Sequence, residues 1–343
     1  MIRVAEQTGC DQPTVSVAMI AYNREQFIAQ AIESVLMQET AFVVELVIGE
    51  DCSTDGTRRI VQAYAGTYPN VIRVLLSEKN LGISRNYRAV WQACRGKYIS
   101  WLDGDDFWRT PQKLQKQVAL MEANPHYSMC GTKTQFVTTS SDGVEKDAGV
   151  LEPAVLKPEY DLADFLTGYP MHTSSMLARR ELVTLQDWLN HAGMLWDACV
   201  FALYAEKGLV GYLGEVMSSW RIHAGGMWTT KSAANQLQCN QKAIDLLDAH
   251  FGGRYHRLLR SREYQVWWTL LRSLAERGKY REARWLYWES ASRLVWLMPL
   301  KVLALGWAAY GGYWCINHWN QLTISLAIRT RLRRLIGRVR LAA

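Results

Sequence analysis

Three carboxylates stand close together directly after an apolar run in the first third of the chain. Residues 98–102 are apolar apart from one serine, and they end in Asp103-Gly104-Asp105-Asp106. Two carboxylates one residue apart in a loop can point into the same space, and neighbouring like charges are costly without a cation. A hard divalent ion such as Mg2+ or Mn2+ removes that repulsion and also binds phosphate oxygens. The cluster therefore predicts a metal site for a phosphate compound. The alternative is a solvated acidic turn, with Asp106 capping the next helix.

A second acidic side chain, Asp51, follows another apolar run at residues 43–48. It opens the string Asp51-Cys52-Ser53-Thr54-Asp55-Gly56, whose last two residues are typical of a turn. Its serine and threonine can accept hydrogen bonds from the backbone at a helix start, so part of the string is structural. A carboxylate at a strand end can also accept a hydrogen bond from the imide nitrogen of uracil or thymine. We therefore expect Asp51 to recognise a pyrimidine base.

Both acidic sites lie where an alternating strand and helix pattern places the ends of its strands. The apolar runs occupy residues 15–20, 43–48, 71–76 and 98–102, and segments of helical period occupy residues 25–37, 57–68 and 84–94. This alternation is typical of parallel strands joined by crossover helices. Open sheets of this kind bind ligands at the carboxyl ends of their strands, so the acids are expected to converge there.

The order of these motifs resembles that of the family 2 glycosyltransferases of the GT-A fold, of the type that builds bacterial surface polysaccharides. The resemblance covers about residues 13–228. It rests on the strand at residues 15–19 with Ala21-Tyr22-Asn23, the string at 50–57, Asn80-Leu81-Gly82 with Arg85-Asn86, and the acidic string at 98–106. It implies an α/β fold with a GT-A-like, Rossmann-type mixed sheet flanked by helices, and the chain adds a helical C-terminal extension.

The resemblance implies a role for each residue of the donor half. Asp51 would contact the donor base, and Tyr22 would stack on the base or flank it. Asp103 would be a ribose or metal-shell residue, and Asp105 the direct ligand of Mn2+ or Mg2+. Arg85 would face the donor phosphates, although an arginine at a helix start is commonly just solvated.

The second half of the chain supplies the remaining groups that the resemblance implies. Asp197 occupies the place of the aspartate that deprotonates the acceptor hydroxyl, with a helix N-cap as the alternative. Trp196 stands where the family usually has another acid, so any acceptor contact of that acid is missing. His223 would complete the metal shell beside Asp105. His172-Thr173 would line the acceptor cleft, with packing at a strand start as the equal alternative.

The function implied is transfer of a sugar from a UDP- or dTDP-sugar to a hydroxyl of a glycan acceptor, with inversion at the anomeric carbon. The alternative is a non-catalytic sugar-nucleotide-binding or scaffold protein. A nucleotidyltransferase would need a glycine-rich phosphate loop after the first strand, where Ala21-Tyr22-Asn23 stands instead. Nucleic-acid binding is not expected, because no aromatic and basic platform accompanies the basic residues.

The charge of the chain is distributed unevenly. Of its 39 basic residues, eight lie after Glu289, where no acid occurs, so the remaining 31 nearly balance the 32 acids. We expect a catalytic domain at residues 1–235, with a nucleotide-binding half at about 13–110 and an acceptor half at about 111–235. A helical hairpin region is expected at residues 236–298, with Gly278 between its two amphipathic runs.

The last segment, residues 299–343, combines an apolar stretch with a basic amphipathic helix. Such a helix suits the anionic inner leaflet of a membrane, although packing on the catalytic domain is the alternative. Membrane association would make a lipid-linked saccharide the natural acceptor. The seven cysteines show no close pair, and residues 1–13 lack an apolar core. We therefore expect a cytoplasmic protein peripherally associated with the cytoplasmic membrane face.

Overall fold

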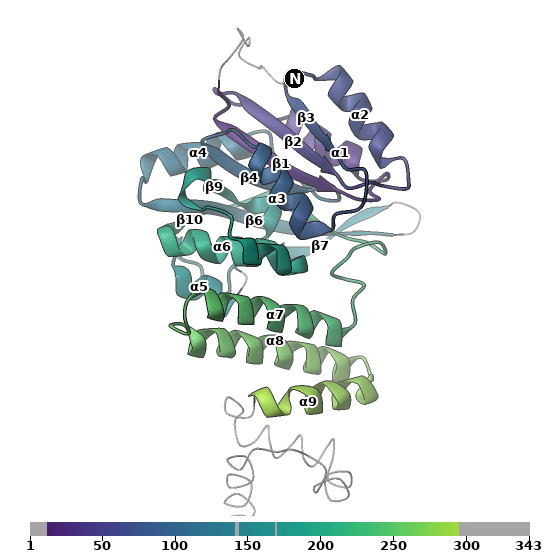
Figure 1. Ribbon diagram of the computed structural model, residues 1–343, viewed down its shortest axis with the longest axis vertical. Helices are drawn as coiled ribbons and strands as arrows, with labels where there is room; N and C mark the ends of the chain where they lie inside the picture. Colours follow the sequence, from purple (N-terminus) through teal and green to yellow (C-terminus); the bar gives the residue numbers. More distant parts are fainter. Residues whose placement is uncertain (1–11, 141–143, 169, 295–343) are drawn as a thin grey trace, which may run out of the picture. The chain divides into compact units, whose positions relative to one another are not determined.

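The computed structural model describes residues 12–140, 144–168 and 170–294, which divide into two compact units (Figure 1). The sheet unit comprises the described residues up to Lys231 together with residues 245–254. The helical unit comprises residues 232–244 and the described residues from Tyr255 onward. The expected apolar segment and basic tail at residues 299–343 lie outside the described residues.

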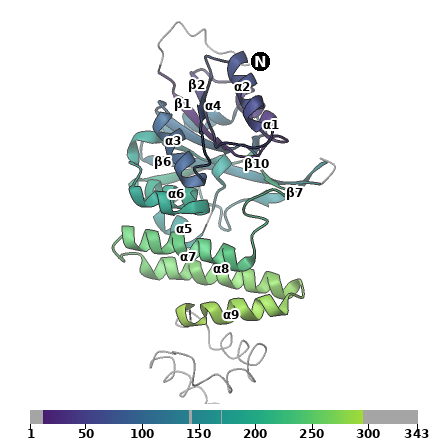
Figure 2. The same ribbon diagram turned by 45° about the vertical axis from the view of Figure 1, so that its right-hand side comes forward.

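In the described part of the chain, ten strands form one mixed sheet in the order β3-β2-β1-β4-β9-β6-β10-β5, with β7 paired to β6 and β8 to β10. The strands are β1 (Val15–Ala21), β2 (Val44–Glu50), β3 (Ile72–Leu76), β4 (Tyr98–Asp103), β5 (Phe107–Trp108), β6 (Tyr127–Thr139), β7 (Glu145–Leu151), β8 (Glu159–Tyr160), β9 (Leu177–Arg179) and β10 (Leu209–Ile222). The first four are mutually parallel, and β9 pairs antiparallel with both β4 and β6. Figure 2 shows β7 as an arm that extends from the sheet with β6.

Helices cover both faces of this sheet (Figure 1). The helices of the sheet unit are α1 (Ile28–Leu36), α2 (Thr57–Thr67), α3 (Ile83–Ala93), α4 (Lys113–Ala123), α5 (Leu162–Thr167) and α6 (Trp196–Lys207), with a 3-10 turn η1 (Thr173–Ser175) before β9. The α/β fold with a mixed sheet and flanking helices is as the sequence predicts.

Alternate side chains of the strands build two different cores. On β1, Val15, Val17 and Met19 join an aliphatic core with the apolar faces of α1 and α4. On β4, Trp101 points to the opposite face, where it contacts aromatic rings of α3 and α6. Because successive strand residues face opposite sides, a continuous apolar run such as β4 serves both layers. β1 and β4 are parallel neighbours between these two cores, so their carboxyl ends meet at the same edge of the sheet.

The predicted strands are confirmed to within one or two residues at their ends. Helix α1 differs from prediction, since it begins at Ile28 and not at Glu25. The backbone N–H of Arg24 donates to Thr57 Oγ1 at 2.7 Å, and that of Glu25 donates to Asp55 Oδ2 at 3.1 Å. These long-range bonds hold the segment after β1 against the loop after β2, so the helix starts one turn later.

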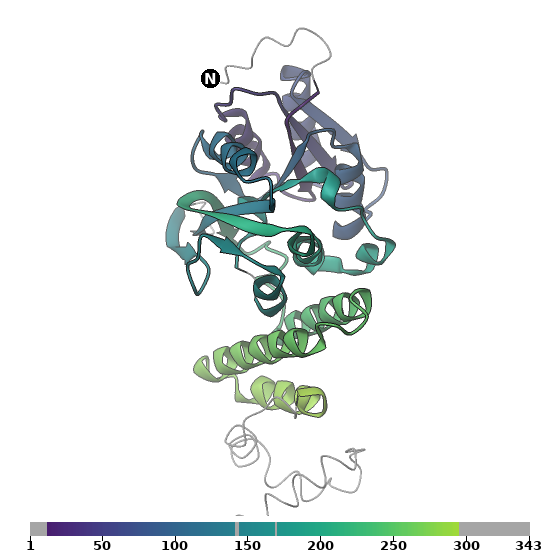
Figure 3. The same ribbon diagram turned by 90° about the vertical axis from the view of Figure 1, so that its left-hand side faces the viewer.

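The helical unit contains residues 233–244 of α7 (Ala233–His250), with α8 (His256–Glu276) and α9 (Tyr280–Leu294). Figure 3 shows α8 and α9 side by side, as the predicted hairpin requires. Gly278 lies between them with φ +71°, a conformation that favours glycine. Trp267 is buried at the centre and donates its Nε1–H to the carbonyl of Leu286 at 3.2 Å.

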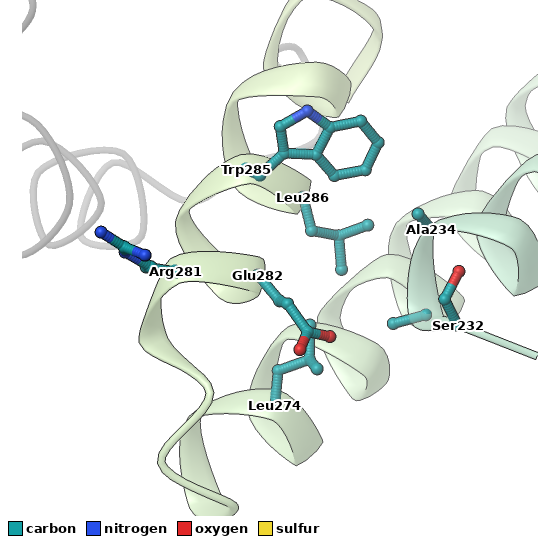
Figure 4. Close-up of a pocket in the computed structure, with 8 residues that line it drawn as sticks. Ser232, Ala234, Leu274, Arg281, Glu282, Trp285 and Leu286 are labelled. Atoms are coloured by element: carbon teal, nitrogen blue, oxygen red, sulfur yellow. The ribbon is translucent and has the colours of Figure 1, made fainter.

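A groove of about 370 Å³ lies within the helical unit, lined by Leu274 from α8 and by Trp285 and Leu286 from α9 (Figure 4). Ser232 and Ala234, at the start of α7, close its other side.

Among the described residues, no helix has the length and apolar character to cross a membrane.

Candidate active site

The acidic string forms a tight turn at the carboxyl end of β4, beside the end of β1. The N–H of Gly104 donates to the carbonyl of Ile20 at 3.0 Å, and that of Asp106 to the carbonyl of Asp103 at 3.0 Å. A side chain at Gly104 would lie 2.9 Å from Ile28 Cδ1 and 3.0 Å from the Ile20 carbonyl. Glycine therefore lets the turn pass this close to β1 without displacing Ile28 or crowding the Ile20 carbonyl. The turn brings one carboxylate oxygen each of Asp103, Asp105 and Asp106 within 4.8 Å of one another.

The crowding of these acids perturbs their protonation. Burial, followed by the charge of Asp105, raises the pKa of Asp103 to about 7. Burial and the charges of Asp105 and Asp103 also raise the pKa of Asp106 well above its usual value. Burial opposes ionisation of Asp105 too, but a hydrogen bond from His223 and the charge of Arg24 bring its pKa below the usual value. Oxygen donors crowded in this way suit a hard divalent cation, which would remove their repulsion.

Each acid also has a partner from a distant part of the chain. Asp105 Oδ2 lies 2.7 Å from Arg24 Nε and 3.3 Å from His223 Nε2. The hydroxyl of Tyr87 donates to Asp103 Oδ1. Asp106 Oδ1 accepts from the backbone N–H of Arg221 at 2.9 Å. Asp106 therefore ties the turn to β10; it does not cap the next helix, which begins at Lys113.

His223 is positioned by contacts on both of its ring nitrogens. Its Nδ1 accepts from the N–H of Gly225 at 3.2 Å, so the ring proton is assigned to Nε2, which faces Asp105. The ring also packs on Phe27, with centroids 4.5 Å apart. The predicted pair of Asp105 and His223 thus lies together. A cation bound through Nε2 would require the ring proton to be on Nδ1, and the hydrogen bond from Gly225 would then be lost.

The predicted base-binding residue Asp51 is buried, and its carboxylate organises the loop after β3. Its Oδ1 accepts from the N–H of Leu81 at 2.7 Å and its Oδ2 from that of Gly82 at 3.0 Å. A carboxylate oxygen has two lone pairs, so each oxygen can accept one further hydrogen bond. Of the other two predicted donor-site residues, Tyr22 is 39% exposed after β1, and Arg85 is exposed in the first turn of α3.

The loops after β1 and β2 are locked together. Asn23 and Cys52 both have positive φ, at 53° and 60°, which few side chains adopt. The N–H of Asn23 donates to Ser53 Oγ at 3.0 Å, and the N–H of Thr54 donates to Asn23 Oδ1 at 2.8 Å. These reciprocal bonds stabilise the two strained backbone conformations. They bring Tyr22 and the Asp51 loop to one edge of the sheet.

Asp197 lies in the first turn of α6 as its second residue, so it is not the N-cap, which is Leu195. Its Oδ2 accepts a hydrogen bond from the hydroxyl of Thr173, and its Oδ1 accepts from the N–H of Ala198 at 2.8 Å. The charge of Asp197 contributes to the raised pKa of Asp103. The predicted catalytic aspartate therefore lies close enough to the acidic string to interact with it.

Trp196 connects these two acidic sites. Its indole stacks on the ring of Tyr87, with centroids 4.9 Å apart and planes 3° from parallel, and Tyr87 in turn donates to Asp103. An aromatic side chain at this position therefore packs on the tyrosine that holds Asp103, where an acid would add a further negative charge. The departure from the family pattern has a structural role here.

Three buried side chains hold the turn that carries Thr173. Trp108 Nε1 donates to the carbonyl of Ser174 at 2.8 Å, Gln117 Nε2 to that of Ser175 at 2.8 Å, and Ser100 Oγ to that of Met176 at 2.7 Å. Three consecutive carbonyls thus accept bonds from β5, α4 and β4. We call this arrangement the η1 seat. It fixes the backbone that presents Thr173 to Asp197.

His172 is buried at the start of the same turn. Its ring stacks on Trp220 at a centroid distance of 4.6 Å, and its Nδ1 lies 2.8 Å from Ser174 Oγ. Burial lowers the pKa of His172 to about 3, so the imidazole is neutral near pH 7. Of the two predicted acceptor residues, Thr173 contacts Asp197, whereas His172 is buried against the ring of Trp220.

Sequence reasoning assigned no role to Arg24, Tyr87 or Arg221. Arg24 lies three residues after the end of β1, so the strand-end rule that singled out Tyr22 also covers it. Tyr87 lies within a predicted helix, and only the fold brings it to Asp103. Arg221 is buried, and its guanidinium reaches Gln30, Glu145 and the carbonyl of Asp105.

Comparison with known proteins identifies relatives of this chain. Residues 16–184 match the family described as Glycosyl transferase family 2. An uncharacterised protein of Mycobacterium tuberculosis is 32% identical over 214 residues, which cover 62% of this chain and 60% of that protein. TuaG of Bacillus subtilis, described as a putative teichuronic acid biosynthesis glycosyltransferase, is 28% identical over 213 residues, 62% of this chain and 80% of TuaG. The match thus spans less than two thirds of the mycobacterial relative's length.

Two solved structures share the fold at low sequence identity. Staphylococcus aureus TarS residues 1–349, in complex with UDP-GlcNAc, has a TM-score of 0.58 and 18% identity, over 85% of this chain and 83% of that one. The mannosyltransferase PcManGT from Pyrobaculum calidifontis, in complex with GDP-Man and Mn2+, has a TM-score of 0.52 and 16% identity, over 91% and 84%. Residues 16–184 thus carry a glycosyl transferase family 2 domain, and the described structure has the GT-A fold of these two solved structures.

Proposed function

We propose that this protein is a metal-dependent, inverting glycosyltransferase that moves a sugar from a UDP- or dTDP-sugar to a hydroxyl of a glycan acceptor. One observation carries the proposal. Asp197 is linked to the acidic string through the stacked rings of Trp196 and Tyr87, which supports a carboxylate base near the proposed diphosphate site. A base next to a leaving group is the arrangement that displacement at a sugar carbon needs.

In this proposal Asp105 and His223 hold Mn2+ or Mg2+, with Asp103 as a ribose or outer ligand. The bound ion supplies Lewis-acid stabilisation of the charge that develops on the departing diphosphate. PcManGT was solved with Mn2+, which supports this ion for the fold. Tyr22 and Asp51 flank the base, and Arg85 meets the donor phosphates from the start of α3.

Asp197 acts as the general base. Its Oδ2 takes the proton of the acceptor hydroxyl, and the hydroxyl oxygen then forms a bond to the anomeric carbon as the bond to the diphosphate breaks. Attack from the side opposite the leaving group inverts that carbon. The hydroxyl of Thr173 orients the carboxylate of Asp197, and the η1 seat fixes the backbone of Thr173. General-base help of this kind contributes roughly 10²–10⁴ in rate.

The proposed pyrimidine base of the donor nucleotide is inferred from the carboxylate of Asp51. The imide N–H of uracil or thymine can donate to either carboxylate oxygen without breaking the bonds from Leu81 and Gly82, because each oxygen keeps a lone pair. The UDP-GlcNAc complex of TarS supports a uridine nucleotide, while the GDP-Man complex of PcManGT represents the other class.

The acceptor is proposed to be a lipid-linked saccharide in the assembly of cell-surface polysaccharide, which the name of TuaG supports. The protein would then associate with the cytoplasmic face of the membrane through its last residues, which include six arginines after residue 328. Removal of residues 320–343 should release the protein from vesicles of anionic phospholipid. Sedimentation of the shortened chain with such vesicles would contradict the membrane role.

Donor binding is tested most directly by thermal unfolding with a panel of UDP-, dTDP- and GDP-sugars, each with and without Mn2+. A ligand that binds only the folded protein raises its melting temperature. We expect stabilisation by a UDP- or dTDP-sugar in the presence of Mn2+ and its loss in Asp105→Asn. Stabilisation by GDP-sugars alone would overturn the pyrimidine assignment, and equal stabilisation with EDTA would overturn the metal assignment.

A further inference from the structure

We propose that Arg24 takes the place of the divalent cation on Asp105 in the free enzyme and becomes a ligand of the donor diphosphate when the cation binds. The proposal deepens the function above and rests on it. Its basis is the 2.7 Å contact between Arg24 Nε and Asp105 Oδ2, the carboxylate oxygen that also faces His223.

The guanidinium of Arg24 lies where a cation is needed. Its side chain is 11% exposed and that of Asp105 18%, so the ion pair is largely removed from water. Arg24 therefore neutralises the acidic string in the same manner as a bound ion would.

The two arginines at this string differ in how firmly they are held. Arg221 donates to Glu145 and Gln30, packs over the rings of Phe27 and Phe107, and its side chain is fully buried. Arg24 donates from its side chain only to Asp105 and to the carbonyl of Asn23, among the contacts of the described residues. Arg24 can thus leave its carboxylate, whereas Arg221 cannot leave without losing a buried network.

Only the side chain of Arg24 needs to move. Its backbone N–H is fixed to Thr57 Oγ1 at 2.7 Å, and the next N–H to Asp55 Oδ2 at 3.1 Å. The Cα therefore stays at the end of β1, next to the acidic turn. When a cation occupies Asp105, the displaced guanidinium remains within a side chain's length of it, and so within reach of the diphosphate that the cation would bind.

An arginine is well suited to this second position. Its planar guanidinium forms paired hydrogen bonds with phosphate oxygens, which an ammonium group does not match. The exchange also has a consequence for binding order. Cation and arginine compete for Asp105 when no nucleotide is present, but they cooperate once a diphosphate offers the arginine another partner.

The test measures Mn2+ affinity and nucleotide affinity separately, by calorimetry on the full chain at pH 8. Arg24→Gln should bind Mn2+ without nucleotide about tenfold more tightly than the wild type, because its competitor on Asp105 is gone. The same variant should bind UDP, and inorganic pyrophosphate, about tenfold more weakly in saturating Mn2+. Arg24→Lys keeps the charge, so it should bind Mn2+ as the wild type does and UDP with Mn2+ more weakly.

Arg88→Gln is the matched control, because it removes another arginine that pairs with an aspartate at 2.9 Å, here with the exposed Asp187. Both affinities of that variant should equal those of the wild type. An Arg24→Gln variant with unchanged or weaker Mn2+ affinity, or with unchanged affinity for UDP and pyrophosphate, would overturn the exchange. If Arg24→Gln does not fold, an unchanged UDP affinity in Arg24→Lys overturns it instead. A wild type that binds neither Mn2+ nor any nucleotide contradicts the proposed function itself.

Discussion

The hydroxyl of Thr173 donates a hydrogen bond to Oδ2 of Asp197, which joins the turn before β9 to the first turn of α6. The other carboxylate oxygen accepts from the N–H of Ala198 at 2.8 Å. Both oxygens of the proposed base are therefore directed, one by a side chain and one by the helix backbone. A base whose orientation is fixed loses less entropy when the acceptor hydroxyl arrives.

Thr173→Val removes the hydroxyl that directs Asp197 and keeps the shape of the side chain. We expect kcat to fall about tenfold, as expected when a supporting hydrogen bond of about 1.4 kcal/mol is lost, with an unchanged donor KM. Thr173→Ser should restore most of the rate. Steady-state kinetics of the three proteins checks this, and a valine variant with normal kcat would show that Thr173 does not position the base.

His223→Gln tests the metal assignment. The glutamine keeps a polar side chain beside Asp105 but lacks the imidazole nitrogen, so Mn2+ affinity should fall about 10- to 100-fold. His126→Gln, at an exposed histidine 3.8 Å from Glu159, is the control and should bind Mn2+ normally. Calorimetric titration with Mn2+ in the presence of UDP measures both. Equal affinities in the two variants would remove His223 from the metal site.

The η1 seat predicts different costs for two buried tryptophans. Trp108→Phe leaves the carbonyl of Ser174 without its donor, whereas the indole N–H of Trp101 has no hydrogen-bond partner among the described residues. Both substitutions lose similar packing area. Trp108→Phe should therefore lower the free energy of unfolding by about 1–3 kcal/mol more than Trp101→Phe. Urea denaturation of both variants measures the difference, and equal losses would argue against the seat.

Lys113 gives the fold a dependence on pH. Burial lowers the pKa of its amine from the usual 10.5 to about 7 in the folded protein. Between these values the unfolded chain binds one more proton than the native state, so stability rises with pH. The Lys113→Met variant has no amine at this position, so its stability lacks this contribution from proton binding. From pH 7 to pH 9.5 the wild type should gain about 3 kcal/mol relative to the variant in urea unfolding. Parallel pH profiles would show that the amine is protonated in the core.

The sequence predicts much of this fold because strand ends carry a readable signal. Residues 98–102 and 43–48 are apolar except for Ser100 and Glu45, so their strands and the acids that follow them are evident without a structure. The predicted start of the first helix was wrong. The residues before Ile28 have a helical period, but their backbone N–H groups bond to Thr57 and Asp55 instead of continuing the helix. Such bonds leave no local pattern.

The contacts between the site residues depend on the same kind of long-range pairing. Tyr87 has the spacing of an apolar helix position, and nothing near it indicates a hydrogen bond to Asp103. In the sequence, Trp196 is notable only because it stands where the family usually has an acid. The fold shows that its ring stacks on Tyr87. The η1 seat joins residues 58 to 76 positions apart, a separation at which single-sequence patterns carry no information.

The central claim is a metal-dependent sugar transfer in which Asp197 is the base. It is tested by measuring nucleoside diphosphate released from the donor panel, by the wild type and by Asp197→Asn, with Mn2+ and with EDTA. We predict that the wild type turns over a UDP- or dTDP-sugar only with Mn2+. Asp197→Asn should bind that donor normally and release diphosphate roughly 10²–10⁴-fold more slowly. Turnover in EDTA, or an unchanged rate in Asp197→Asn, would contradict the account.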